Sequence, residues 1–210
     1  MRYRTIVVTP FAQNCTLLIC TKTLEAAVVD PGGDVDRIIA AIESEHVNVT
    51  QIWLTHGHID HIGGVVALRD HYQVPVIGPH KDDAMFIDQV DKMAQMFGVP
   101  TPPRFTPTRW LEEGDRLQLG QRDIDVMHCP GHAPGHVIFI DREARIAQVG
   151  DVLFKGSVGR TDLPGGDHAH LMASICQLWP LGDDVVILPG HGPQSTLGEE
   201  RRHNPFVNNS

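Results

Sequence analysis

An apolar segment that runs directly into a histidine-rich turn constrains this chain more than any other feature. The segment and turn read Ile52-Trp53-Leu54-Thr55-His56-Gly57-His58-Ile59-Asp60-His61, followed by Gly63 and Gly64. In an extended backbone His56 and His58 point to the same side, because side chains alternate along a strand, so the two can hold one ion. Beyond the turn, Asp60 and His61 face another direction and can serve a neighbouring ion. Imidazole nitrogens and carboxylate oxygens suit a borderline cation such as Zn²⁺.

Length and composition are typical of one layered α/β domain. The chain has 210 residues, of which 41% are hydrophobic and 20% charged, so we predict a single domain over residues 1–210. The net charge of −9, without a block of Lys or Arg, argues against a nucleic-acid or anionic membrane partner. No apolar run is long enough to span a bilayer, and residues 1–10 lack the apolar core of an export signal. We therefore expect a cytoplasmic protein, with a monomer slightly favoured.

The cysteines form neither a CxxC motif nor a dense framework. They stand at Cys15, Cys20, Cys129 and Cys176. This spacing is typical of small, buried apolar side chains in a reducing compartment.

Strand and helix patterns alternate along the chain. Strands are predicted over residues 5–9, 16–20, 26–29, 51–54, 74–77, 110–119, 124–128, 136–140, 146–149 and 185–188. Helices are predicted over 35–45, with Asp34 as the N-cap, and over 63–71, 81–97, 168–178 and 196–204. The proline-rich stretch 98–107 reads as a surface loop. Two halves, each with strands followed by strand and helix, suit a sandwich of two sheets with outer helices.

Further polar candidates stand just after predicted strands. His132 follows the strand 124–128, Asp151 follows 146–149, His191 follows 185–188, and Asp30 ends its own strand. A rigid sheet holds side chains at its strand ends while the loops stay open to substrate. The recurrence of this placement strengthens each of these residues as a candidate.

This ordered set of residues resembles the metallo-β-lactamase superfamily over nearly the whole chain. The set is His56-Gly57-His58-Ile59-Asp60-His61, then single His132, Asp151 and His191. The resemblance implies an α/β fold, a four-layer αβ/βα sandwich. It also implies that His56, His58 and His132 hold one metal ion, that Asp60, His61 and His191 hold a second, and that Asp151 bridges both.

Other motifs resemble the short glyoxalase II-like hydrolases, which are similar to hydroxyacylglutathione hydrolase. They are Pro130-Gly131-His132-Ala133-Pro134-Gly135-His136, Gly159-Arg160-Thr161-Asp162, Pro189-Gly190-His191-Gly192 and Asn204-Pro205-Phe206. The resemblance implies hydrolysis of S-D-lactoylglutathione or a similar acyl-glutathione, with a basic residue, here Arg160, binding a substrate carboxylate. Full-length glyoxalase II has an added C-terminal helical domain that helps to hold glutathione. This chain ends at Ser210, so thioester hydrolysis is the firmer expectation.

The expected chemistry follows from two cations that share a water molecule. Such a water loses a proton near neutral pH, and the resulting hydroxide can attack a thioester carbonyl. Asp60 can bind metal and also orient the nucleophile, which makes it the catalytic candidate. Asp30 is read either as a hydrogen-bond acceptor for a ligand histidine or as a turn former before Pro31. Arg160 is read either as a clamp for a substrate carboxylate or as a plain surface arginine.

Two other functions stay open at this point. A mononuclear iron persulfide dioxygenase shares the Gly-Arg-Thr-Asp turn, but such dioxygenases favour an aspartate and a tyrosine where this chain has Gly192-Pro193. A non-catalytic metal-binding module would be marked by a missing ligand, and none is missing. The expected cofactor is Zn²⁺, as one or two ions, with iron or manganese also compatible with the donors. The expected partner is a small thioester, with no nucleic acid and no membrane.

Several polar and apolar residues are given structural interpretations. Histidines interpreted as exposed or core-satisfied are His71, His80, His128, His136, His168 and His170. The pair Asp82-Asp83 reads as first-turn helix charge, which the helix dipole favours. Met85, Met93, Met96, Phe86 and Phe97 are expected to bury one helix face.

Overall fold

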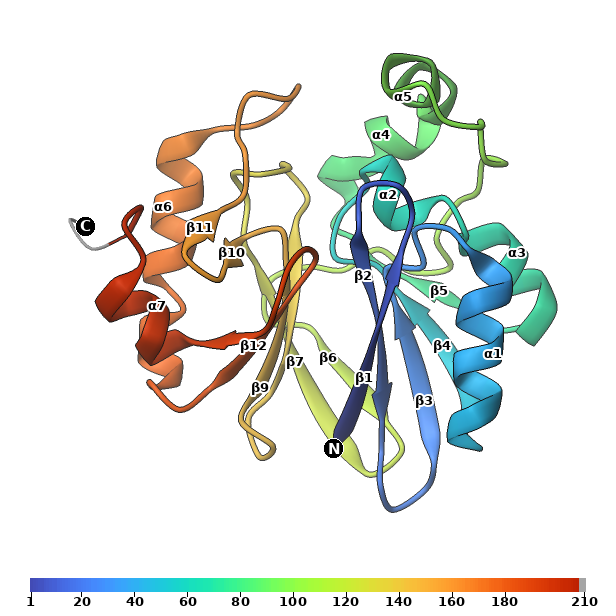
Figure 1. Ribbon diagram of the computed structural model, residues 1–210, viewed down its shortest axis with the longest axis horizontal. Coiled ribbons are helices and arrows are strands. Elements are labelled where there is room, and N and C mark those ends of the chain that lie inside the picture. Colours follow the sequence, from blue (N-terminus) through green and yellow to red (C-terminus); the bar gives the residue numbers. More distant parts are fainter. Residues whose placement is uncertain (208–210) are drawn as a thin grey trace.

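Two sheets packed face to face form the centre of the molecule, and helices cover their outer faces (Figure 1). This is a computed structural model, and it describes residues 1–207. The four-layer arrangement expected from the sequence is confirmed.

The first sheet is built from the N-terminal part of the chain. In spatial order its strands are β1 (Arg2–Val8), β2 (Gln13–Ile19), β3 (Glu25–Val29), β4 (Asn48–Trp53) and β5 (Val76–Ile77). The pairs β1–β2 and β2–β3 are antiparallel, whereas β3–β4 and β4–β5 are parallel. A parallel pair needs a crossover connection, and helices α1 (Val35–Glu45) and α3 (Val65–Tyr72) lie within these two crossovers.

The second sheet is built from the C-terminal part of the chain. Its spatial order is β13 (Ser195–Thr196), β12 (Val186–Pro189), β9 (Ile146–Gly150), β8 (Val137–Asp141), β7 (Arg122–His128) and β6 (Arg116–Leu119). All its neighbours are antiparallel except β9 and β12, which are parallel. Between β9 and β12 the chain forms the hairpin of β10 (Leu153–Phe154) and β11 (Ser157–Val158), and helix α6 (His168–Cys176).

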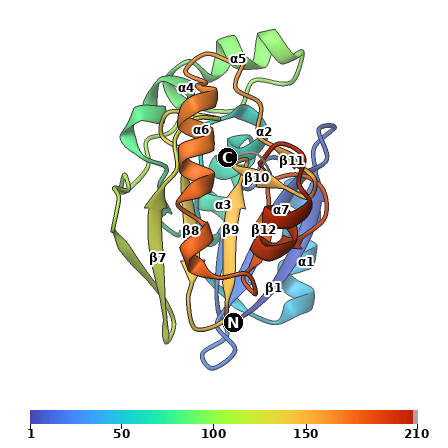
Figure 2. The ribbon, with the colours of Figure 1, turned by 90° about the vertical axis from the view of Figure 1, so that its left-hand side faces the viewer.

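The helices are divided between the two outer faces. Around the first sheet lie α1, α2 (Ile59–Ile62), α3, α4 (Ala84–Asp88) and α5 (Val90–Phe97), with a 3₁₀ turn η1 (Lys81–Asp83) before α4. Helix α6 runs across the outside of the second sheet, with α7 (Leu197–His203) near it (Figure 2). A second 3₁₀ turn, η2 (Trp179–Leu181), follows α6. No helix in residues 1–207 combines the length and apolar character needed to cross a membrane.

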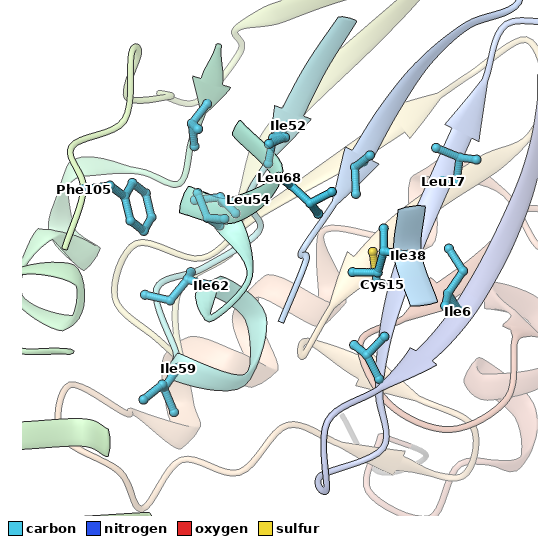
Figure 3. Close-up of a cluster of buried hydrophobic side chains, with 14 of the residues drawn as sticks. Ile6, Cys15, Leu17, Ile38, Ile52, Leu54, Ile59, Ile62, Leu68 and Phe105 are labelled. Atoms are coloured by element: carbon cyan, nitrogen blue, oxygen red, sulfur yellow. The ribbon is translucent and has the colours of Figure 1, made fainter. Parts of the chain in front are cut away.

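Three buried clusters fill the spaces between these layers. One lies between the first sheet and its helices and includes Leu17, Ile38 and Ile52 (Figure 3). A second includes Ile175 of α6 and Ile187 of β12. The third lies between the two sheets and draws side chains from both. It contains Trp53 and Phe139, whose ring centroids are 5.1 Å apart. Each sheet is thus apolar on both faces, and the polar site residues are confined to strand ends.

Several local expectations are corrected by the structure. The helix expected over 81–97 is broken into η1, α4 and α5, because Gln89 leaves helical geometry at φ −111° and ψ 26°. Of the strand expected over 110–119, only β6 forms. Asp34 does precede α1, but its backbone is left-handed and its carboxylate accepts a hydrogen bond from the Thr9 N–H instead of capping the helix.

Two expectations about burial are wrong in part. Cys176 is exposed, although Cys15, Cys20 and Cys129 are buried as expected. Met85 and Met96 are exposed at 42% and 64%, because the break at Gln89 divides the helix face that they were expected to share. The very short strands β10, β11 and β13 have two residues each, too few for a recognisable sequence pattern.

Candidate metal centre

The histidine-rich turn leaves the first sheet at the end of β4. Residue Leu54 is still paired, since its N–H donates to the Ile77 carbonyl at 3.0 Å, and the chain then turns away from the sheet. His58 remains extended, at φ −69° and ψ 148°, and serves as the N-cap of the short helix α2. Asp60 and His61 therefore lie in the first turn of a helix, whereas His56 and His58 lie in the segment before it. This local geometry agrees with the prediction from spacing.

The first group of candidate ligands contains His56, His58 and His132, and all three are buried. His58 Nδ1 lies 2.9 Å from His132 Nε2. The ring of His56 meets those of His58 and His132 edge-on, with centroids 4.7 and 4.9 Å away. Two residues from the first sheet and one from the loop before β8 thus converge on one point.

The second group contains Asp60, His61 and His191. His191 Nε2 is 3.2 Å from Asp60 Oδ2, and His61 Nε2 is 3.8 Å from the same oxygen. Asp151 lies between the groups: its Oδ2 is 3.5 Å from His132 Nε2 and 3.6 Å from His191 Nε2, and its Oδ1 is 3.5 Å from His61 Nε2. The structure therefore brings together all seven residues that the sequence nominated.

Hydrogen bonds orient four of the five histidine rings in the same way. The Nδ1–H of His56 donates to the Thr55 hydroxyl, that of His61 to Asp30, that of His132 to the Arg160 carbonyl and that of His191 to the Phe11 carbonyl, over 2.8 to 3.1 Å. A ring that donates through Nδ1 keeps a lone pair on Nε2, the form in which imidazole binds a metal.

Asp30 anchors this arrangement from below the turn. Its side chain is fully buried and accepts the Thr55 N–H at 2.8 Å, the Thr55 hydroxyl at 2.6 Å and His61 Nδ1 at 3.0 Å. Of the two interpretations drawn from the sequence, the contact with His61 matches the one in which Asp30 orients a histidine. Asp30 thereby orients His61 directly and His56 through the Thr55 hydroxyl.

Burial and nearby charges shift the pKa values of the site residues in different directions. Burial, reinforced by neighbouring imidazoles, holds the pKa of His56 and His58 well below the usual histidine value, so both are neutral. Burial also acts to lower the pKa of His61, but Asp151, Asp60 and Asp30 together raise it to about 10. Burial opposes ionisation of Asp60, yet His61 and His191 hold its pKa below the ordinary value. Burial thus keeps His56 and His58 in the neutral form that binds a metal, whereas the raised pKa of His61 means that a cation bound at its Nε2 would displace a proton.

The donors fit one or two metal ions. Several buried site atoms have no hydrogen-bond partner within residues 1–207, namely the Nε2 atoms of His56, His58 and His61, and Asp151 Oδ1. Buried polar atoms nearly always have a hydrogen-bond partner. The unpaired nitrogen and oxygen atoms gathered at this point are therefore suited to bind a metal cation. Nitrogen and oxygen donors of this kind suit Zn²⁺, and also iron and manganese.

A cavity of about 360 Å³ opens over these residues. Its polar floor includes Asp60, His132, Asp151 and His191. Its apolar wall is formed by Phe11, Ile59, Phe97, Phe154, Val158 and Leu163. Arg160 also lines it, and among residues 1–207 no other lysine or arginine does so. Its guanidinium makes two 2.7 Å hydrogen bonds to Asp162, which leaves part of its donor fork for a ligand.

Two buried residues near the centre make contacts that the sequence did not predict. His136, which the sequence places among the exposed or core-satisfied histidines, is buried; its ring stacks on His56 at 4.8 Å, and its Nε2 accepts the Asp151 N–H at 3.0 Å. Asp83, predicted to be a first-turn helix charge, does lie in the turn η1, but its side chain is fully buried and accepts hydrogen bonds from Gly57 and Gly135 in two loops. The repeated Gly-His pair at Gly135-His136 was the signal for the first. For Asp83 the local sequence holds none.

Two other set-aside histidines, His80 and His128, form a further group with Asp82. The two rings stack at 4.4 Å with planes 25° apart. His80 Nδ1 accepts the Asp82 N–H, and His128 Nε2 donates to the Pro134 carbonyl. Nearly parallel rings that already use one nitrogen each do not direct their lone pairs to one point, so we assign no ion there.

Comparison with known proteins agrees with this geometry. The family model described as the Metallo-beta-lactamase superfamily matches residues 8–191, a range that contains every candidate ligand. The chain belongs to the metallo-β-lactamase superfamily. The chain is 43% identical over 210 residues to a protein named hydroxyacylglutathione hydrolase GloC of Haemophilus influenzae, with 99% of each chain covered. It is thus similar in full length to a metallo-hydrolase of this superfamily.

Solved structures of other proteins have a similar fold. The BLEG-1 B3 metallo-β-lactamase superposes with a TM-score of 0.91 at 35% identity, covering 98% of this chain and 99% of that one. TTHA1623 in a di-iron-bound form gives 0.88 at 39% identity, covering 97% and 99%. ETHE1 from Myxococcus xanthus gives 0.81 at 24% identity, covering 99% and 85%, and this likeness concerns the fold alone.

Proposed function

We propose that this metallo-hydrolase cleaves a thioester, with S-D-lactoylglutathione or a similar acyl-glutathione as substrate. The observation that carries the proposal is the complete set of seven donors, placed in two groups with Asp151 between them. The whole-chain similarity to GloC supports the choice of a hydroxyacylglutathione.

Metal ions held by the two donor groups would lower the pKa of a bound water and polarise a carbonyl, and would so supply a nucleophile near neutral pH. Asp60 stands where its carboxylate can accept a hydrogen bond from that nucleophile and orient it toward the substrate, because its oxygen faces the cavity floor beside His191. The leaving thiolate needs no strong general acid. Asp60 is therefore the catalytic residue of the proposal.

The cavity wall supports a substrate with a small acyl group and one anionic arm. The six apolar side chains exclude water from the bond that breaks, which strengthens the electrostatic interactions at the floor. Arg160 offers its unused N–H groups to a substrate carboxylate, and Asp162 holds the guanidinium in place. Glutathione carries such carboxylates, so Arg160 is the proposed substrate-binding residue.

Release of free thiol from S-D-lactoylglutathione by zinc-loaded protein tests this function. We expect turnover in the wild type and a loss of more than about 100-fold in kcat for Asp60→Asn. Glu199→Gln on the exposed face of α7 is the matched control, with wild-type kcat expected. An absence of thiol release from every acyl-glutathione tried, by protein that binds zinc, would sink the proposal.

Two competing activities have their own assays. The full-length similarity to the BLEG-1 structure favours testing hydrolysis of a chromogenic β-lactam. The persulfide dioxygenase alternative predicts oxygen uptake with glutathione persulfide by iron-loaded protein. A mononuclear centre would leave one of the two donor groups without a role, which favours the hydrolase. Either activity in the absence of thioester cleavage would replace the proposal.

A further inference from the structure

Asp83 joins two loops that are far apart in the sequence. It closes the 3₁₀ turn η1, and its side chain is fully buried. Its Oδ2 accepts the Gly57 N–H at 2.7 Å, and its Oδ1 accepts the Gly135 N–H at 2.5 Å. Both carboxylate oxygens are thus used on backbone donors, although Asp83 also precedes helix α4 and makes no side-chain cap there.

The two loops carry the first group of candidate ligands. Gly57 stands between His56 and His58 at the end of β4, in the first sheet. Gly135 lies three residues after His132, just before β8 of the second sheet. A single carboxylate therefore connects the ligand loop of one sheet with the ligand loop of the other.

Backbone contacts around Asp83 also hold the loop at Gly57 close to the loop at Gly135, and we call this place the junction. The His80 N–H donates to the Gly135 carbonyl at 3.0 Å, and the Val137 N–H donates to the Thr55 carbonyl at 2.7 Å. A Cβ on Gly135 would lie 2.6 Å from the Asp83 nitrogen, so the close approach of the two segments requires glycine there. The junction is tightly packed, so we expect a change at Asp83 to alter the positions of both loops.

We infer that Asp83 is a positioning residue that sets the separation of His56 and His58 from His132. The inference rests on the proposed metal centre. Asp83 acts through the backbone, since within residues 1–207 its carboxylate accepts hydrogen bonds from the Gly57 and Gly135 amides and from no candidate ligand. A carboxylate is needed because both facing groups are donors, and an amide would turn its own NH₂ toward one of them.

Zinc titration of metal-free protein, with a chromophoric competitor, tests the inference without reference to turnover. In Asp83→Asn we expect one of the two zinc ions to bind about tenfold more weakly, the size of effect seen when an outer partner of a metal ligand is removed. The other ion should keep its wild-type affinity. Asp82→Asn is the matched control, because Asp82 is exposed and contacts His80 instead of the loops. His132→Ala, which removes a ligand of the first group, identifies the affected ion.

The outcomes separate this inference from the proposed function. Wild-type protein that binds no zinc would remove the metal centre itself. Wild-type protein that binds two ions while Asp83→Asn binds both with unchanged affinity, and with an unchanged circular dichroism spectrum, would overturn the role of Asp83 alone.

A measurement on the wild type covers the case in which Asp83→Asn does not fold. Hydrogen exchange followed by NMR should show the Gly57 and Gly135 amides protected to the level of the β4 and β8 amides, because each donates to a buried carboxylate. Exchange of these two glycines at the rate of exposed loops would contradict the inference. Under the same conditions the exposed Gly192 amide should exchange fast.

Discussion

At the scale of single residues, buried carboxylates organise the centre more than the histidines do. Asp30 and Asp83 are both fully buried and have no direct place among the seven candidate ligands. Between them they accept five hydrogen bonds, three on Asp30 and two on Asp83. Buried polar oxygens are costly unless they are hydrogen-bonded, so each of these two carboxylates requires its donors at fixed positions.

Replacing Asp30 tests how much its buried carboxylate contributes to stability. Asp30→Asn should lower the free energy of unfolding of the metal-free protein by about 3 kcal/mol, because it removes one partner of a buried pair with His61. Urea unfolding followed by circular dichroism measures the change. Asp36→Asn, at an exposed position in the first turn of α1, should change it by less than about 0.5 kcal/mol. Equal stability of the two variants would contradict this account.

Sequence reasoning could reach only part of the residue set. His56, His58, Asp60 and His61 are recognisable because their geometry is local: strand alternation and the turn decide where they point. Asp83 is different, since its partners lie 26 and 52 residues away. Nothing in the sequence Lys81-Asp82-Asp83 distinguishes the exposed aspartate from the buried one.

At the scale of elements, two helix N-termini show how a tertiary contact can override a local capping preference. Asp34 has the residue type of an N-cap, but the Thr9 N–H takes its carboxylate. Asp167 does cap α6, since its side chain accepts the His170 N–H at 2.9 Å. A capping residue satisfies a free helix N–H only when no tertiary donor competes for it.

The two aspartates therefore predict different results on replacement. Asp167→Ala should lower the free energy of unfolding by about 1 kcal/mol, the usual cost of a lost N-cap. Urea unfolding gives the value, and Asp123→Ala, on an exposed position of β7, is the control. Asp167→Ser, which keeps a capping oxygen, should recover most of the loss. A failure of serine to recover stability would show that capping is not the cause.

At the scale of the whole molecule, the candidate centre joins the two sheets. The first sheet contributes His56, His58, Asp60 and His61 through the end of β4, and the second contributes His132, Asp151 and His191 through the loops around β8, β9 and β12. A cation held there would be bound by the folded state and released on unfolding, so it would stabilise both halves together.

Metal removal is expected to weaken the fold as a unit. Calorimetry of zinc-loaded protein should give a higher unfolding temperature than chelated protein, since free zinc at 100 times its dissociation constant adds roughly 2.7 kcal/mol of stability. Asp151→Asn should reduce the difference, because its carboxylate lies between both groups. An unfolding temperature unaffected by chelation would contradict the joined centre.

The sequence by itself determined the class of fold, the strand ends at which polar residues gather and the identity of the seven candidate ligands. Hydrophobic periodicity and the histidine turn are local patterns that can be recognised without the rest of the chain, whereas the four-layer fold and the full ligand set, with His132, Asp151 and His191, are implied by the resemblance to the superfamily. Only the tertiary structure decided that Asp83 is buried and that Cys176 is exposed. It also decided that the Asp34 carboxylate accepts a hydrogen bond from the Thr9 N–H, and that the helix after His80 breaks at Gln89. Each of these depends on which distant backbone or side chain arrives beside the residue, and that is settled by the packing of the two sheets and their helices.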